Sequence, residues 1–295
     1  MPIRTTYRNF WQKQRPLVAI RGPEELTRAT RLCIRCTQTG LPPPKQRALI
    51  SDWCSLLPTL DHVRLLQFDS QVPQNLFDAA CHMRNLESLW IQWSSIRNLD
   101  QIRASRRLRH LHIGSSAQIR SIHPLAEMTS LKSLSLENFK RITDLGPLSP
   151  LTGLEELAIT GGMWGHQKVD SLAPLAKLRS LRWLHLGGVR SLDESLKPLG
   201  ALQRLKLIFV NLGNYPIEEL AWLSVRFAKI DHGVRPYSDF HREYALLPCK
   251  KCSKRTMVLL FGKGRSRTIC KNCDAEKLAA QVSRFKQCVA ACSSS

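Results

Sequence analysis

Hydrophobic residues recur at regular intervals through the middle of the chain. A pattern of the form Leu-x-x-Leu-x-Leu, as at Leu131, Leu134 and Leu136, has copies that begin at positions 63, 86, 108, 131, 154, 181, 202 and 225. The intervals between these copies are 23, 22, 23, 23, 27, 21 and 23 residues. The apolar and polar alternation within each copy predicts a short strand with one buried face. Since one such unit cannot bury its own leucines, the repeat predicts stacked units that share a core.

The segments between these strands have a different period. Apolar residues recur at every third position, as at Ile142, Leu145, Leu148 and Leu151, and this spacing favours 3-10 or short helical turns. Prolines at positions 124, 147, 150, 174 and 198 exclude long helices in these segments. We therefore expect an α/β solenoid, in which a curved parallel sheet is backed by short 3-10 or helical return segments.

This pattern resembles the leucine-rich-repeat family, in the short form of about 22 residues that occurs in many bacterial intracellular proteins. The resemblance covers residues 60–231 and implies a leucine-rich-repeat solenoid. The sequence departs from the family at the position three residues after the last strand leucine, where asparagine or cysteine is usual. The residues there are Ser94, Ser116, Phe139, Gly162, Val189 and Val210. The usual ladder of side chains that bonds the turn backbone is therefore largely missing.

The repeat divides the chain into parts. Before it, short strands are expected at Leu17–Ile20 and Leu32–Ile34, and Trp53 belongs to one apolar face of an expected helix. The run Pro42–Pro44 is expected to be a rigid break between them. The predicted parts are an N-terminal cap and irregular repeat at 1–60, the solenoid at 61–231, a linker at 232–248 and a cysteine-rich module at 249–295.

The residues between the strand leucines define one surface of the solenoid, which we call the concave face. Side chains alternate along a strand, so these residues are expected to meet solvent. Trp90 and Trp183 are large apolar residues at such positions, and exposed tryptophan is typical of a protein-binding surface. The alternative is that they pack on neighbours or under a terminal segment. Acidic residues, Glu137 and Glu156, lie in the middle of the array. The candidate partner-binding residues are Trp90, His110, His112, Trp183, His185, Arg204 and Lys206.

Two Cys-x-x-Cys pairs occur near the C-terminus. They are Cys249 with Cys252, and Cys270 with Cys273, and 17 residues separate them. Four cysteines at this spacing predict a tetrahedral, structural zinc site, because no ligand position is left open for catalysis. The module resembles a zinc ribbon or treble-clef finger, with a hairpin between the pairs and a helix over residues 274–289. The alternative is that the pairs are redox-active or free thiols.

The formal charge of +21 is concentrated at the two ends of the chain. Residues 1–48 carry a net charge of +8 and residues 232–295 a net charge of +9, so +4 remains for the 183 residues between them. Basic ends attract nucleic acid, acidic proteins or anionic lipid. The candidate nucleic-acid contacts are at the tip of the expected hairpin, at Lys263, Arg265 and Arg267. A solvated surface is the alternative reading of this charge.

No motif supplies a nucleophile and base, a phosphate loop or paired catalytic carboxylates. We therefore expect a non-catalytic scaffold that binds a protein partner through the concave face, in an adaptor or immunity-like role that the family resemblance alone suggests. The alternative is a nucleic-acid-binding protein that acts through the basic zinc module. No membrane span and no small-molecule substrate are expected. Without a secretory signal or a dense disulfide pattern, the expected location is the cytoplasm.

Overall fold

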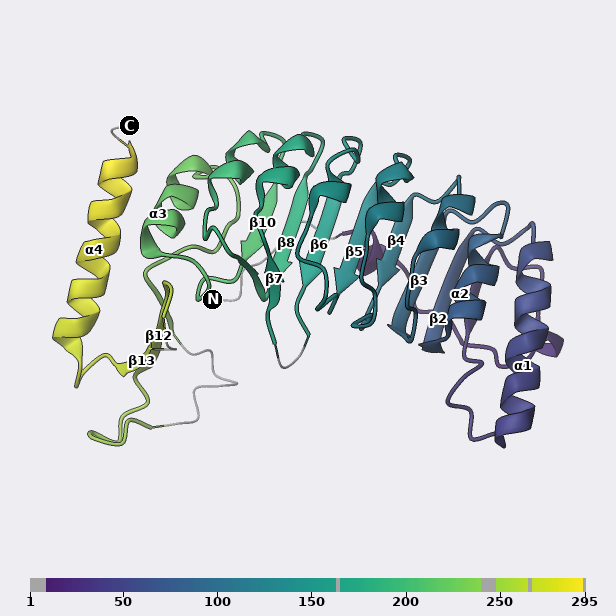
Figure 1. Cartoon of the computed structure of the whole chain (residues 1–295). Coiled ribbons are helices and arrows are strands. Elements are labelled where there is room, and N and C mark those ends of the chain that lie inside the picture. The colour runs from purple at the N-terminus through teal and green to yellow at the C-terminus, as the bar shows by residue number, and fades with distance from the viewer. Residues whose placement is uncertain (1–8, 163–164, 240–247, 265–266, 294–295) are drawn as a thin grey trace.

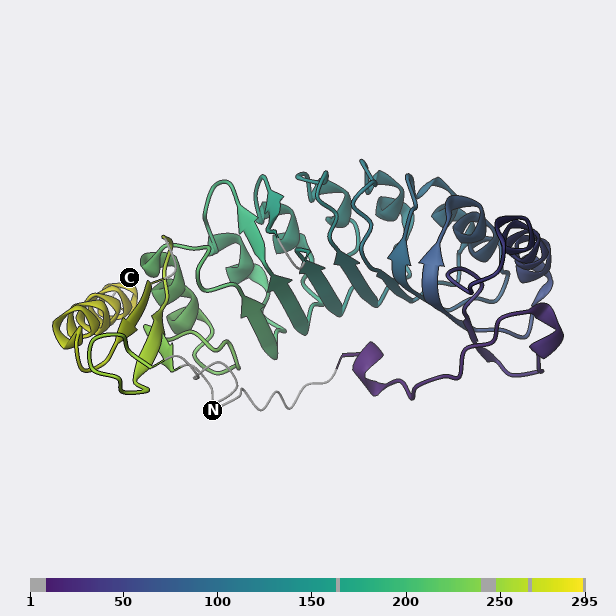
Figure 2. The same cartoon turned by 90° about the horizontal axis from the view of Figure 1, so that it is seen from below.

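A computed structural model describes residues 9–162, 165–239, 248–264 and 267–293. Its main feature is an eight-stranded parallel sheet with the order β1-β2-β3-β4-β5-β6-β8-β10 (Figure 1). The return segments lie on one side of this sheet, and the other side is the concave face (Figure 2). The strands are β1 (Arg31–Ile34), β2 (Leu65–Val72), β3 (Ser88–Ser94), β4 (His110–Ile113), β5 (Ser133–Glu137), β6 (Glu156–Thr160), β8 (Trp183–Gly187) and β10 (Leu207–Val210).

The strand leucines form the core, as the repeat predicts. Leu134 of β5 lies in register between Leu111 of β4 and Leu157 of β6, and all three side chains are buried. Each strand adds one such residue, and the column runs through the whole sheet. Its members are Leu32, Leu66, Leu89, Leu111, Leu134, Leu157, Leu184 and Ile208.

The return segments are short, as the three-residue period predicts. One is an α-helix of eight residues and the others are 3-10 turns, four of which have proline in the first turn. Proline suits this position because the first N–H groups of a helix have no partner within it. The segments are α2 (Gln74–Cys81), η4 (Asp100–Ala104), η5 (His123–Glu127), η6 (Gly146–Leu148), η7 (Ala173–Lys177) and η8 (Lys197–Ala201).

The turns after the strands are filled without the asparagine ladder. Phe139 and Val189 are buried at two of these positions, and the hydroxyls of Ser94 and Ser116 hydrogen-bond at 2.6 Å in two others. Apolar packing and hydroxyl hydrogen bonds therefore fill turns that have no ladder of side-chain amides. The longest repeat contributes β7 (Gln167–Val169), which forms a two-stranded sheet with β9 (Val189–Ser191) of the next repeat.

The N-terminal part differs from the expectation in two places. The strand expected at Leu17–Ile20 does not form, and only Ile20 bridges to Ile34. The prolines are not a break, because Pro43 begins helix α1 (Pro43–Leu56), where its fixed φ fits the first turn. The expected helix face is otherwise confirmed, since Trp53 is fully buried. Short 3-10 turns are η1 (Trp11–Lys13), η2 (Pro23–Glu25) and η3 (Leu57–Thr59).

The predicted register of the last strand is wrong by three residues. In β10, Leu207 lies beside Trp183 and Phe209 lies beside His185. The segment 202–210 fits the repeat in two frames, and the chain uses the one that buries Leu205, Ile208 and Val210 towards the core. The residues expected on the concave face here, Arg204 and Lys206, therefore precede the strand and are exposed at its edge.

The eighth repeat, expected from position 225, does not form a strand. Residues Ile217–Arg226 form helix α3, whose buried face includes Leu220 and Leu223. What remains of the repeat is a single parallel bridge between Leu207 and Asp231. The helix packs beside η8 in the row of return segments, and its buried face extends the leucine core.

The cysteine-rich module packs against this end of the solenoid (Figure 1). It contains β11 (Tyr237–Asp239), β12 (Met257–Leu260), β13 (Arg267–Cys270) and α4 (Ala275–Ser293). The expected linker at 232–248 therefore contributes an edge strand to the module, because β11 pairs with β12.

Several contacts fix the module in place. The Gly262 N–H donates to the Leu212 carbonyl at 2.9 Å, Arg284 of α4 pairs with Glu218 of α3 at 2.6 Å, and Phe285 packs against the solenoid core. The module is therefore a C-terminal cap. None of the helices in the described part of the chain is long and apolar enough to cross a bilayer.

Candidate functional site

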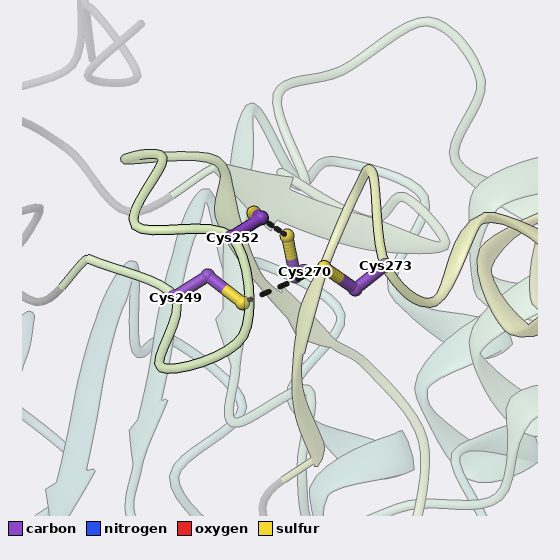
Figure 3. Close-up of side chains that lie close together, drawn as sticks. All are labelled: Cys249, Cys252, Cys270 and Cys273. Atoms are coloured by element: carbon purple, nitrogen blue, oxygen red, sulfur yellow. Dashed lines mark hydrogen bonds between the residues drawn. The ribbon is translucent and has the colours of Figure 1, made fainter.

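The four cysteines of the module come together in space (Figure 3). All four Sγ atoms lie within 4.8 Å of one another. The Sγ atoms of Cys249 and Cys273 are 3.8 Å apart, and those of Cys252 and Cys270 are 3.7 Å apart. Within the described residues, no other group of three or more histidine, cysteine or acidic side chains is arranged to hold a metal ion.

The first pair sits on a tight turn that its sequence favours. The Cys249 N–H donates to the Lys254 carbonyl at 2.9 Å, and the Ser253 N–H donates to the Cys249 carbonyl at 2.8 Å. Ser253 has a positive φ of 56°, which closes the loop. The Lys251 N–H points at Cys249 Sγ, 3.4 Å away, and such an N–H stabilises a thiolate.

The second pair lies where strand β13 meets helix α4. The Asp274 N–H donates to the Cys270 carbonyl at 2.9 Å, and the Asp274 carboxylate accepts from the Cys270 N–H at 3.2 Å. The Thr256 hydroxyl, 3.2 Å from Cys270 Sγ, and backbone N–H groups lower the pKa of Cys270 to about 6. The neighbouring thiols, Cys252 first, raise the pKa of Cys273 to about 12. Four thiolates this close together require a cation.

The geometry of the cluster fits a tetrahedral metal ion. Metal–sulfur bonds of about 2.3 Å place the sulfurs of a tetrahedron about 3.8 Å apart, which matches both measured pairs. A disulfide requires about 2.05 Å between sulfurs. The four cysteines could therefore hold a metal ion, and four protein ligands would leave that ion no open position.

The other six cysteines lie apart from this cluster. Cys33 and Cys36 are both buried, and burial raises the pKa of Cys33 to about 11 and that of Cys36 to about 12. Protonated, buried thiols are poor nucleophiles and poor ligands. This arrangement is consistent with an incidental role for the N-terminal pair.

The concave face carries aromatic and imidazole rings near both of its ends. Trp90 stacks on His112, with ring centroids 3.6 Å apart, and the His112 Nδ1 shares a hydrogen bond of 2.9 Å with the Ser135 hydroxyl. At the other end, His185 lies 5.6 Å from Trp183 and 4.7 Å from Phe209. Trp90 with His112, and His185 with Phe209, are in register on neighbouring strands, whereas Trp183 and His185 both lie on β8.

The two tryptophans are less exposed than the repeat predicts. Trp183 is only 7% exposed, because it packs with Ala158 and Leu207 on the same face. Phe209 is 42% exposed on the concave face beside His185. The sequence pattern instead predicts Lys206 at this position. Phe209 lines a groove of about 460 Å³ together with His166, residues 210–214, residues 259–262 and Gly264.

A segment of the chain itself lies over part of the concave face (Figure 2). Phe10 stacks on His110 with centroids 3.4 Å apart and an interplanar angle of 2°. Trp11 meets Trp90 edge-on at 5.0 Å. The Phe10 N–H donates to the Glu156 carboxylate at 2.8 Å. Trp90 therefore packs under a terminal segment, as the alternative interpretation of this residue predicts.

Burial keeps the imidazoles of the concave face neutral. Desolvation lowers the pKa of both His110 and His112 to about 4, and it also lowers the pKa of His185. Burial likewise raises the pKa of Glu137. Neutral rings stack on aromatic groups without a charge to desolvate, so these histidines are parts of an apolar surface at neutral pH.

Comparisons with known proteins concern the fold. No family model matches the chain, and no curated protein matches its sequence. A solved internalin from Listeria monocytogenes is 23% identical, covers 60% of this chain and 48% of its own, and has a TM-score of 0.50. An internalin C2 from the same organism is 24% identical, over 52% of this chain and 64% of its own, with a TM-score of 0.44. A leucine-rich-repeat protein from Leptospira interrogans is 15% identical, over 60% and 50%, with a TM-score of 0.48.

The chain spans between about half and two thirds of the length of these proteins. The in-register leucine column, the short return segments and the first of these likenesses agree. The fold is a leucine-rich-repeat solenoid.

The basic residues of this leucine-rich-repeat chain are distributed differently from the expectation. Lys263 lies between β12 and β13 and forms an ion pair with Glu194 of the solenoid, so its charge is already paired. Arg267 begins strand β13, with its backbone beside Leu260. Arg265 lies outside the described residues.

Proposed function

We propose that this chain is a protein-recognition scaffold in which the concave face binds a partner protein, in an adaptor or immunity-like role. The observation that carries the proposal is the pair of rings on neighbouring strands, His185 of β8 and Phe209 of β10, of which Phe209 is 42% exposed and lines a groove. Large aromatic side chains on a rigid surface are typical anchors of protein interfaces. A catalytic role has no comparable support, and the absence of enzyme activity stays a prediction.

The proposal also includes a structural zinc ion held by Cys249, Cys252, Cys270 and Cys273. Four thiolates in a tetrahedron, with no open position, suit zinc as a structural ion. The small sheet and the exposed helix α4, which has no fully buried residue, leave this cap with little core of its own. Such modules depend on their metal for folding.

Elemental analysis tests the zinc proposal. The purified chain is expected to hold one zinc ion, and Cys270→Ser is expected to remove most of it. Metal removal should make residues 248–293 sensitive to protease while the circular dichroism of the solenoid changes little. A metal-free chain whose cap resists protease would contradict the proposal.

A nucleic-acid function through the cap remains the second candidate because of its net charge. Two internal ion pairs weigh against it, since Lys263 pairs with Glu194 and Lys271 pairs with Asp239. Binding through phosphates would weaken by about 0.9 log units per log unit of salt for each neutralised contact. The protein-scaffold proposal predicts a much smaller dependence on salt.

Capture from nuclease-treated lysate of the native host separates these candidates. Phe209→Ala is expected to weaken retention of a partner protein by roughly 2 kcal/mol or more, which is about 30-fold. The control is the double variant Lys250→Ala with Arg255→Ala, both exposed on the cap, which should retain the partner. A complex that vanishes with nuclease and with this control variant would favour nucleic acid instead.

A further inference from the structure

The segment Asn9–Ile20 is attached to the solenoid mainly at its two ends, and one hydrogen bond of 3.1 Å from the Arg31 guanidinium to the Arg15 carbonyl joins its middle to the edge strand. At one end are the ring contacts of Phe10 and Trp11. At the other end, Ile20 pairs with the edge strand β1, where its N–H donates to the Cys33 carbonyl at 2.9 Å. Between these places the chain has few buried groups, and Val18 is 91% exposed. A segment held at its ends with an exposed middle opens more readily than the core does.

The attachment at Phe10 and Trp11 involves three different strands of the sheet. Trp90 lies on β3, His110 on β4 and Glu156 on β6, and each contributes one contact to the segment. The contacts are also of different kinds, because two aromatic side chains of the segment meet two rings of the solenoid and a backbone N–H donates to a carboxylate. These contacts define a ring-and-carboxylate surface, consisting of Trp90, His110, His112 and Glu156.

We propose that the ring-and-carboxylate surface is a receptor for a basic segment that presents two adjacent aromatic residues on a helical turn. The chain's own N-terminal segment is its resident occupant, and a partner protein that presents such a segment displaces it. This inference rests on the proposed function and names both the partner's chemistry and the internal competitor that regulates access.

Charge supports a basic ligand. Residues 1–20 contain four basic residues and no acidic one. The middle of the concave face instead presents carboxylates, Glu137 on β5 and Glu156 on β6. Opposite charges speed association and exclude acidic competitors more than they add affinity. An acidic aromatic segment would therefore be rejected by a surface that accepts a basic one.

The resident segment is an imperfect ligand, which makes it exchangeable. The Trp11 Nε1 and the His110 Nδ1 are buried without a hydrogen-bond partner within the described part of the chain. Each buried, unpaired polar group costs stability. A partner segment that places a carbonyl or hydroxyl near His110 satisfies a group that the resident leaves unpaired.

A labelled peptide of residues 1–20 tests the receptor directly. Fluorescence anisotropy measures its binding to three full-length chains: wild type, Phe10→Ala with Trp11→Ala, and the matched control Val18→Ala. The double variant vacates the surface, so it is expected to bind the peptide at least tenfold more tightly than the other two. An unlabelled peptide of residues 1–20 that carries the same two alanines should not compete with the labelled peptide. This control changes only the peptide and leaves the solenoid unaltered. His110→Ala in the double variant should remove the binding.

Equal affinity of the three chains, or no binding to the double variant, would overturn the inference. A wild-type dimer that dissociates when Phe10 and Trp11 are replaced would also overturn it, because the segment would then be exchanged between copies. If the peptide fails while partner capture still depends on Phe209, only this inference fails. If capture depends on no concave-face residue, the proposed function itself fails.

Discussion

The register of the last strand makes a sharp prediction about two neighbouring residues. Ile208 is 2% exposed and points into the leucine core, whereas Phe209 is 42% exposed on the concave face. Replacing a buried isoleucine by alanine costs about 2–5 kcal/mol, from lost burial and the cavity left behind. We expect Ile208→Ala to lie within this range, at roughly 3 kcal/mol, and to lower Tm by several degrees.

Thermal unfolding followed by circular dichroism measures this difference, with Phe209→Ala as the matched control. Phe209 already exposes much of its ring, so its loss should cost under about 1 kcal/mol. In the frame expected from the Leu-x-x-Leu-x-Leu pattern, Leu205 and Leu207 point inward and Ile208 faces solvent. A loss of stability in Ile208→Ala as small as that in Phe209→Ala would therefore support that frame and contradict the observed register.

Three further predictions concern the core, the buried histidines and the cap. Leu134→Asp places an unpaired charge among the leucines and should abolish soluble expression, whereas Thr152→Asp, on an exposed turn, should not; equal yields would contradict the core assignment. Burial lowers the pKa of His112 to about 4, so the unfolded chain binds more protons between about pH 6.5 and pH 4. Stability should fall as pH drops through this window, by roughly 3 kcal/mol from this residue, and urea titrations of the His112→Asn variant should show a smaller fall. Phe285→Ala should expose the cap to limited proteolysis, because this ring packs on the solenoid core. Arg284→Ala should change little, since an exposed ion pair contributes about 0.2–1 kcal/mol; the reverse order would show that charge holds the cap.

The sequence predicts the solenoid well where one frame of apolar residues excludes the others. Leu131, Leu134 and Leu136 allow a single choice of inward face, and the structure adopts it. Near Leu207 several apolar residues follow one another, so two frames compete. Packing against the end of the core then decides between them, and no local pattern contains that information.

The cysteine cluster and the covered part of the concave face also differ in how well the sequence predicts them. The cysteine cluster is predictable because Cys249 and Cys270 each belong to a short, local motif whose spacing already implies the ligand geometry. The cover over Trp90 is not, because Trp11 lies 79 residues away in a stretch without periodicity. A tryptophan at an outward strand position has the same local sequence whether it meets solvent or a distant segment.

The central claim is that a partner protein contacts the concave face beside Phe209. Site-specific photocrosslinking in the native host tests it most directly, with a photoreactive phenylalanine analogue at position 209, at position 177 on a return segment, or at position 255 on the cap. We predict a discrete, nuclease-resistant protein adduct from position 209 and none from position 177. Adducts from position 255 alone, removed by nuclease, would contradict the claim.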